Sequence, residues 1–174
     1  MKVKVSAVSY LNTLPFLYGI KQSGLEQEID LSLDIPSDCA RKLLNDEVDL
    51  GLVPVAIIPQ LKEHHIISDY CIGADGPVDT VALFSDVPLE EIENIYLDYH
   101  SRSSVTLVQL LAKAFWKIKP NWIRAEEGFI DQIQGTTAGV VIGDRTFGLS
   151  KKYKYDLAEA WKAFTGKPFV FAAW

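Results

Sequence analysis

The sequence has few residues that bind transition metals or form disulfides: two cysteines, one methionine and three histidines among 174 residues. Cys39 and Cys71 do not form a Cys-x-x-Cys pair, so we expect two reduced thiols without a metal or redox role. His64 and His65 are adjacent, and adjacent side chains on a helix diverge by about 100°. Without a third ligand at a suitable spacing they predict a solvent-exposed helix end, and we expect no metal site.

Several common motifs and signals are also missing. There is no Walker motif, no Gly-x-Gly-x-x-Gly, no Gly-x-Ser-x-Gly and no His-Glu-x-x-His. No apolar run reaches the roughly 20 residues that span a bilayer. Ser, Asn, Thr and Pro interrupt the apolar residues near the N-terminus, so this stretch does not resemble a signal peptide. We therefore expect no membrane contact and a cytoplasmic location.

Excess positive charge is absent as well, because the formal net charge is -6. A broad nucleic-acid surface needs a basic face, so we expect no nucleic-acid partner. A small anion is still compatible with this charge, since a helix N-terminus and one or two arginines can hold it locally. Hydrophobic residues make up 48% of the chain, which predicts a folded core.

Strand and helix patterns alternate along the chain, which predicts an α/β protein with parallel sheets covered on both faces. Apolar or alternating runs predict strands at residues 2–8, 29–35, 49–55, 66–72, 80–85, 94–98, 121–126, 138–144 and 169–174. Helices are predicted at residues 15–22, 38–45, 56–61, 88–92, 103–117, 129–133 and 156–164. Pro15 suits a first helical turn, and Ser37 is the expected N-cap of the second helix.

The pattern restarts near residues 84–88, which predicts two lobes. We expect the first lobe to hold residues 1–84 and 168–174, and the second lobe to hold residues 85–167. The last apolar strand has no helix after it.

Polar residues follow several predicted strands, and ligands of open α/β sheets bind beyond the carboxyl ends of strands. The segment Ser101, Arg102, Ser103 and Ser104 opens the longest predicted helix. Hydroxyls and free backbone N–H groups beside an arginine predict a carboxylate site. Plain helix capping is the alternative, although capping explains only one of the serines.

Other strand ends give weaker candidates, which we expect to contact a ligand or to serve only as caps and turns. They are Tyr10 and Asn12 after the first strand, Val55 after the third, Gly76 and Thr80 around a Gly-Pro turn, and Asp144 after the strand at 138–144.

An ordered set of motifs resembles the chorismate dehydratase family of the futalosine route to menaquinone. The motifs are VSYLNTLPF, DLGLVPVA, IGADGPV, SRSSV, VIGD and TGKPFVFAAW, which together cover residues 8 to 174. The resemblance implies a two-lobed fold like the type II periplasmic binding proteins. It also implies dehydration of chorismate to 3-[(1-carboxyvinyl)oxy]benzoate without a metal or organic cofactor.

The resemblance assigns roles to several residues. Asn12 matches the family's essential asparagine, and Thr80 stands where the family has a serine. The segment from Ser101 to Ser104 matches the family's carboxylate-binding segment. No His or Glu stands at a strand end, so a carboxylate of the substrate could take the ring proton; Asp75, Asp79 and Asp144 are the alternative bases.

The family resembled is longer than this chain, so we expect the first lobe to be incomplete at its C-terminus. Apolar surface is then expected near Phe169 to Trp174, with low stability or homo-oligomer formation. Two other functions remain open: 1,4-dihydroxy-6-naphthoate synthase of the same pathway, and a binding protein that only captures a small anion.

Overall fold

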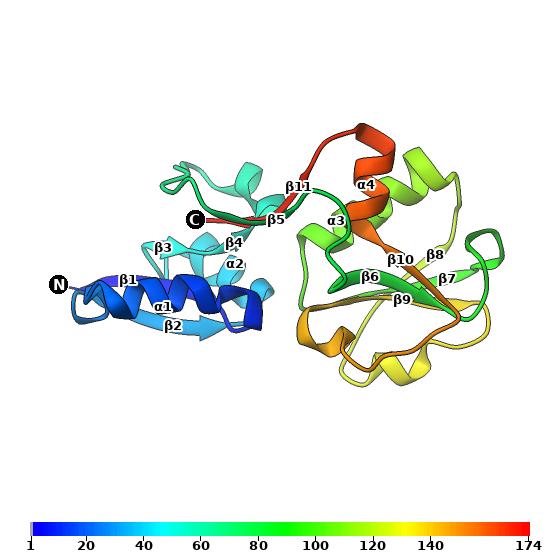
Figure 1. Ribbon diagram of the computed structural model, residues 1–174, viewed down its shortest axis with the longest axis horizontal. Coiled ribbons are helices and arrows are strands. Elements are labelled where there is room, and N and C mark those ends of the chain that lie inside the picture. The colour runs from blue at the N-terminus through cyan, green and yellow to red at the C-terminus, as the bar shows by residue number, and fades with distance from the viewer. Residues whose placement is uncertain (1) are drawn as a thin grey trace. The chain divides into compact units, whose positions relative to one another are not determined.

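The computed structural model describes residues 2–174 and divides the chain into two compact units (Figure 1). The first unit comprises Met1–Gly73 and Val170–Trp174, and the second comprises Ala74–Phe169. The predicted boundary at residue 84 is therefore wrong by one strand. Strand β6 (Val81–Ser85) belongs to the second unit because it pairs with β9 (Thr137–Ile142) and β10 (Tyr153–Asp156).

A parallel three-stranded sheet forms the base of the first unit, in the order β2-β1-β3. Its strands are β1 (Val3–Val8), β2 (Ile29–Asp34) and β3 (Leu50–Gly51). Helix α1 (Leu14–Gln22) follows β1, and helix α2 (Pro36–Leu44) connects β2 to β3. Helix α2 buries Cys39 and Ala40 in a core cluster that also contains Val8, Leu52 and Ile57.

The first unit also holds a second small sheet in the order β4-β11-β5, whose strands are β4 (Val53–Pro54), β11 (Phe169–Ala173) and β5 (Cys71–Ala74). The single strand predicted at 49–55 is thus wrong. Leu52 still donates to the Ser6 carbonyl at 2.9 Å, but β4 then pairs antiparallel with β11. Pro54 has no N–H to extend a ladder, which shortens this strand. Residues 66–70 form no strand either.

The C-terminal strand is better covered than expected. Phe171, Ala172 and Ala173 are buried, and Trp174 packs edge-on against Phe16 with ring centroids 5.8 Å apart. Only Val170 is exposed in this strand, because β11 runs between β4 and β5. Apolar surface is nevertheless exposed near this strand, because Ile67, whose nitrogen donates to the Trp174 carbonyl oxygen at 3.1 Å, is 61% exposed and its neighbour Ile66 is 63% exposed. The expectation of apolar surface near Phe169 to Trp174 therefore holds for neighbouring side chains and not for Phe171, Ala172 and Ala173.

Two helix predictions in the first unit also need correction. Helix α2 begins at Pro36, and its N-cap is Ile35 in an extended conformation, not Ser37. Proline suits this first position because its fixed φ matches the helix and its missing N–H costs nothing there. The helix predicted at 56–61 is a 3-10 helix, Val55–Gln60, with Pro59 inside it.

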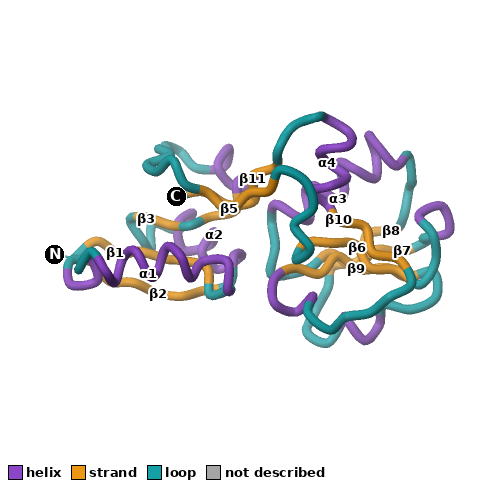
Figure 2. Tube along the Cα trace, viewed as in Figure 1, coloured by secondary structure: helices purple, strands orange, loops and turns teal. Residues whose placement is uncertain are grey.

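One mixed five-stranded sheet forms the second unit, in the order β10-β6-β9-β7-β8 (Figure 2). Strands β7 (Asn94–Leu97), β8 (Asn121–Arg124) and β9 are mutually parallel, whereas β6 and β10 add antiparallel pairs. The prediction of purely parallel sheets is wrong here. Strand β10 was not predicted, because it spans four residues and alternates tyrosine with charged side chains.

Helices α3 (Ser103–Leu111) and α4 (Leu157–Thr165) belong to the second unit. The predicted helix at 103–117 continues beyond α3 as a π-helix, Ala112–Trp116, and ends where Lys117 takes a left-handed conformation. Short 3-10 helices, Leu89–Glu91 and Phe129–Gln132, replace the helices predicted at 88–92 and 129–133. Across residues 2–174, no helix has the length and apolar character that crossing a membrane requires.

Candidate functional site

One edge of the five-stranded sheet gathers most of the predicted site residues. Strands β7 and β9 are parallel and end at this edge, and the antiparallel strand β6 begins there. Thr80 precedes β6, the segment 101–104 follows β7, and Asp144 follows β9. The Gly143 nitrogen donates to the Thr80 carbonyl oxygen at 2.8 Å, so two of these segments are in direct contact.

The serine-arginine segment combines a helix cap with a solvent-exposed cation. Ser101 Oγ accepts a hydrogen bond from the Ser104 nitrogen at 3.0 Å, which is the capping role considered above. Ser103 and Ser104 are buried, whereas Arg102 is exposed. Among residues 2–174 the Arg102 guanidinium has no hydrogen-bond or ion-pair partner. Capping thus occupies Ser101 and leaves Arg102 able to bind an anion.

Asp98 holds the ends of β7 and β9 together from inside the protein. Its side chain is fully buried, and Oδ2 accepts from the Ile142 nitrogen at 3.1 Å and from Arg145 Nη2 at 2.5 Å. Oδ1 accepts from the His100 nitrogen at 3.0 Å. A buried carboxylate needs such partners, since leaving one unpaired is costly. Asp98 therefore fixes the start of the serine-arginine segment relative to β9.

The Gly-Pro turn that carries Gly76 and Thr80 is fixed by a second buried carboxylate, Asp156. Its Oδ2 accepts from the nitrogens of Val78 and Asp79 at 2.9 and 2.7 Å. Gly76 has a φ of 123°, which glycine adopts readily and other residues rarely do.

Two of the three alternative bases are already paired. Asp75 accepts a hydrogen bond from Lys162, and Asp79 pairs with Lys154 at 3.0 Å on the surface. Asp144 is half-buried in a 3-10 helix, Gly143–Thr146. Of the three, Asp144 is the one without an ion pair among the described residues.

The remaining predicted site residues lie in the first unit. Asn12 is exposed in a 3-10 helix, Leu11–Thr13, that directly follows β1. Its Oδ1 accepts from Thr13 Oγ1 at 3.4 Å, and its Nδ2 has no partner among residues 2–174. Tyr10 packs against the core cluster of this unit, and Val55 follows β4. Asn12 therefore keeps two N–H donors available at the end of the first strand.

A polar cluster under helix α2 was not predicted. Asp34 Oδ2 accepts from Ser6 Oγ and Ser32 Oγ, both at 2.8 Å, and from Lys42 Nζ at 2.6 Å. Burial alone would raise the pKa of Asp34, but the hydrogen bonds from Lys42, Ser32 and Ser6 outweigh it and lower the pKa from its usual value. Burial also raises the pKa of the adjacent Cys39 thiol to about 11. This cluster joins β1, β2 and α2.

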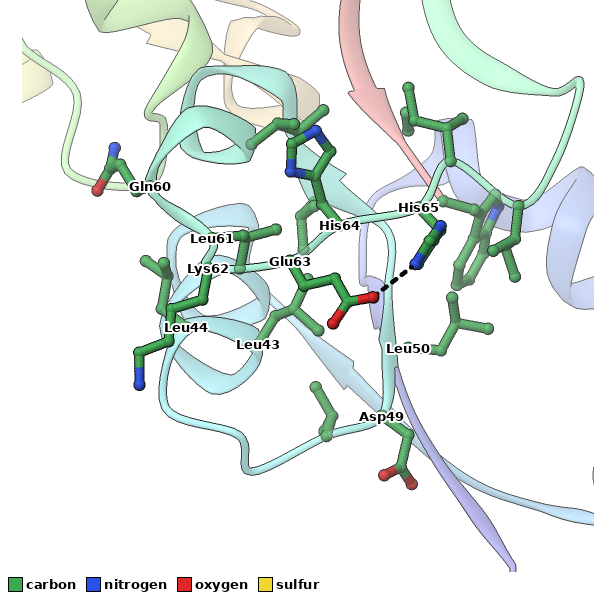
Figure 3. A pocket seen from close by; sticks show the side chains of 18 of the residues that line it. Leu43, Leu44, Asp49, Leu50, Gln60, Leu61, Lys62, Glu63, His64 and His65 are labelled. Carbon is green, nitrogen blue, oxygen red and sulfur yellow. Dashed lines mark hydrogen bonds and ion pairs between the residues drawn. The ribbon is translucent and has the colours of Figure 1, made fainter.

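A cavity of about 520 Å³ lies elsewhere in the first unit (Figure 3). Its lining is apolar at Leu43, Leu50 and Trp174, among others, and charged at its rim. His65 Nε2 lies 3.2 Å from Glu63 Oε1, and both side chains are exposed in a segment that is not helical. None of the predicted site residues lines this cavity. The sheet edges that carry the polar residues are therefore better candidates than the cavity.

Sequence and structure comparisons identify relatives of the chain. Residues 3–174 match a family described as menaquinone biosynthesis. The chain belongs to this menaquinone biosynthesis family. A crystal structure of protein AF1704 from Archaeoglobus fulgidus is similar, with 16% sequence identity and a TM-score of 0.71. The alignment covers 99% of this chain and 66% of AF1704, so the chain spans just under two thirds of that protein.

More distant neighbours share the fold. The Candida albicans CA3427 gene product is described as having the generic periplasmic binding protein fold. It is 12% identical to this chain with a TM-score of 0.51, and the alignment covers 99% of this chain and 62% of that one. A protein from Ruminococcus gnavus is 13% identical with a TM-score of 0.54, and the alignment covers 99% of this chain and 83% of that one. These similarities confirm the predicted two-lobed fold of the type II periplasmic-binding-protein class.

No group of three or more His, Cys, Asp or Glu side chains in residues 2–174 is placed to hold a metal ion. The residues that sequence reasoning missed are Asp98 and Asp156. Asp156 and Glu159 have the spacing of a capping box, which predicts a helix start. Nothing in the sequence connects Asp156 to a turn almost 80 residues earlier, because that contact depends on the pairing of β6 with β10.

Proposed function

We propose that this protein is a chorismate dehydratase, which converts chorismate to 3-[(1-carboxyvinyl)oxy]benzoate in menaquinone biosynthesis. Membership of the menaquinone biosynthesis family supports a step in that pathway. The observation that carries the choice of substrate is the edge of the second sheet. There the unpaired cation of Arg102 lies at the start of α3, on the same edge as Thr80 and Asp144.

The residues at this edge suit a dicarboxylate substrate that is oriented by hydrogen bonds and is not attacked by a nucleophilic side chain. An arginine beside a helix N-terminus favours a carboxylate, since its planar guanidinium donates two parallel hydrogen bonds. Chorismate carries two carboxylates and an allylic hydroxyl. Asn12 at the end of β1, in the first unit, is proposed as a further hydrogen-bond donor to the substrate. Tyr10 and Val55 of the first unit and Gly76 of the second unit are proposed as further substrate-binding residues.

The reaction removes water from the ring. The ring C–H and C–O bonds break, a ring double bond forms, and the hydroxyl leaves with a proton as water. The aromatic product makes the step strongly favourable overall, and we propose that orientation and a few fixed hydrogen bonds lower its barrier. We propose that Asn12 and Thr80 donate to the departing hydroxyl or to a carboxylate. Asp75 and Asp79 are paired with lysines, which leaves Asp144 as the protein's alternative base. We propose that the substrate's own carboxylate takes the ring proton.

The experiment is incubation of purified protein with chorismate, followed by ultraviolet absorbance and mass spectrometry. We expect a product lighter by one water, formed by the wild-type chain and lost in Asn12→Ala. Asn45→Ala is the matched control, because Asn45 is also an exposed asparagine of the first unit and lies at the C-terminal end of α2. Saturable binding without product would instead indicate a small-anion-binding protein.

The base is tested separately. Asp144→Asn should reduce kcat by less than about 10-fold if the substrate supplies the base, since a general base is commonly worth 10²–10⁴-fold. A loss of about 10³-fold with substrate binding retained would assign the base to Asp144. Turnover of a later pathway intermediate, with chorismate unchanged, would favour 1,4-dihydroxy-6-naphthoate synthase.

A further inference from the structure

Asp156 is a buried carboxylate whose two oxygens serve different segments of the second unit. It is 6% exposed. Oδ1 accepts from the nitrogens of Ala158 and Glu159 at 2.9 and 3.0 Å and so caps helix α4. Oδ2 accepts from the nitrogens of Val78 and Asp79 at 2.9 and 2.7 Å. A helix cap needs only one acceptor oxygen, so the second oxygen has a separate task.

That task is to hold an unusual turn directly before Thr80. The Thr80 nitrogen donates to the Val78 carbonyl oxygen at 2.8 Å, which closes a three-residue turn. Asp79 at its centre has a φ of 63°, a left-handed conformation that residues other than glycine rarely adopt. Such a conformation persists only where surrounding contacts impose it, and these positions concentrate at functional sites. The two hydrogen bonds from Val78 and Asp79 to Asp156 are contacts of this kind.

We propose that Asp156 is a positioning residue that sets the orientation of the Thr80 hydroxyl through this turn. The proposal rests on the proposed function, in which Thr80 acts on chorismate. Among residues 2–174, Asp156 itself accepts only from backbone N–H groups, so it would act through Thr80. Asp98 is another buried carboxylate of this unit that accepts from backbone N–H groups. It connects the ends of β7 and β9 and does not bond to this turn.

The first test is Asp156→Asn. The side-chain shape is kept, but one acceptor oxygen becomes an NH₂ group that cannot accept from two N–H donors. We expect kcat for chorismate dehydration to fall roughly 10- to 100-fold while KM changes less than about threefold. A smaller folded fraction would also lower the apparent kcat at unchanged KM, so kcat is calculated per folded enzyme, with the folded fraction measured by circular dichroism. A purely structural effect would then leave the kcat of the folded enzyme at its wild-type value.

A double-mutant cycle shows whether Asp156 acts through Thr80. In Thr80→Val, which lacks the hydroxyl, Asp156→Asn should have little further effect on kcat, because the group that it positions is gone. An equal loss of kcat in the wild-type and Thr80→Val backgrounds would overturn the proposal.

Amide hydrogen exchange provides a measurement that does not need activity. Exchange at Val78, Asp79 and Thr80 should accelerate in Asp156→Asn and stay at its wild-type rate in Asp131→Asn, which changes an exposed carboxylate of the same unit. Unchanged amide exchange rates at these three residues in Asp156→Asn would show that Asp156 does not stabilise the turn. If the wild-type chain does not turn over chorismate, the proposed function is refuted, and so is the catalytic role of Asp156. The exchange rates would still decide whether Asp156 holds the turn.

A second pair of variants applies if Asp156→Asn does not fold. Asp79→Gly removes the cost of the left-handed conformation but loosens the turn, whereas Asp79→Asn tolerates that conformation and loses the same charge. We expect kcat of Asp79→Gly to lie several-fold below that of Asp79→Asn, with the melting temperature at least as high. Equal kcat values for the two variants would contradict a role for the turn.

Discussion

The Gly143 nitrogen and the Thr80 carbonyl oxygen are joined by a hydrogen bond of 2.8 Å, which connects the end of β9 to the residue before β6. The Thr80 nitrogen is engaged as well, through Val78. Both backbone groups of Thr80 are thus fixed, and its side chain is the part left to act on a ligand. This arrangement allows the hydroxyl to be tested without moving the backbone.

Thr80→Val is the first prediction. Valine keeps the branched shape and removes the hydroxyl, whose hydrogen bond to the Val78 carbonyl is long at 3.4 Å. We expect kcat for chorismate dehydration to fall about 10²-fold or more, as for loss of one fixed donor in an active site, with little change in melting temperature. Thr80→Ser, which keeps the hydroxyl, should stay within a few-fold. Wild-type kcat in Thr80→Val would exclude a catalytic hydroxyl here.

The second prediction concerns Arg102, the exposed cation at the start of α3. Arg102→Ala should raise KM for chorismate roughly 10- to 100-fold by removing a charged pair of hydrogen bonds, with kcat less affected. Arg102→Lys should be intermediate, since lysine keeps the charge but not the planar geometry. Stability should change by less than about 0.5 kcal/mol, because the side chain is exposed.

Lys119→Ala is the matched control for Arg102. Lys119 is an exposed cation just before β8, and β8 runs parallel to β7, so Lys119 lies at the opposite edge of the sheet. An equal rise of KM in both variants would mean that overall charge, and not a specific site, attracts the substrate.

A third prediction follows from Asp34 in the first unit. Its pKa is lowered from the usual value in the folded protein, so its stabilising effect is complete above the pKa of the unfolded chain and is lost as the pH falls through the lower folded value. The free energy of unfolding should therefore decrease below about pH 4 in the wild type. Asp34→Asn should cost about 1–3 kcal/mol at pH 7 and remove this part of the pH dependence.

Denaturant melts between pH 2.5 and 7 measure the effect of Asp34. Asp30→Asn serves as the control, because Asp30 is an exposed carboxylate on the same strand β2. The ion-pair explanation fails if the two variants show the same pH dependence.

Cysteine reactivity is the fourth prediction. Cys39 is buried with its pKa raised to about 11, whereas Cys71 is exposed. Only the thiolate reacts, and at pH 8 roughly one Cys39 thiol in a thousand would be ionised even without the steric protection of burial. Brief iodoacetamide treatment should therefore add one label to the native protein and two to the unfolded protein, as counted by intact mass. Two labels on the native protein would show that Cys39 is accessible.

Much of the fold could be predicted because local patterns decide it. Alternating or apolar runs of β-branched residues indicate β1, β6 and β9, and a glycine after an amphipathic run marks the end of α4 at Gly166. Arg102 and Asp144 could be selected because polar residues after apolar strands lie at the edge where α/β sheets bind ligands. Thr80 precedes β6, and it could be selected through the Gly-Pro turn before it and the family resemblance.

The sequence by itself determined the α/β class, most strand positions and the polar residues at the strand ends, since these depend on periodicity and on neighbours along the chain. Only the tertiary structure decided strand direction and long-range pairing. The antiparallel entry of β6 beside β9 brings Thr80 to Gly143, and the pairing of β6 with β10 brings Asp156 to Val78. These contacts join residues more than 60 positions apart, and their energy comes from packing and hydrogen bonds that no local pattern contains.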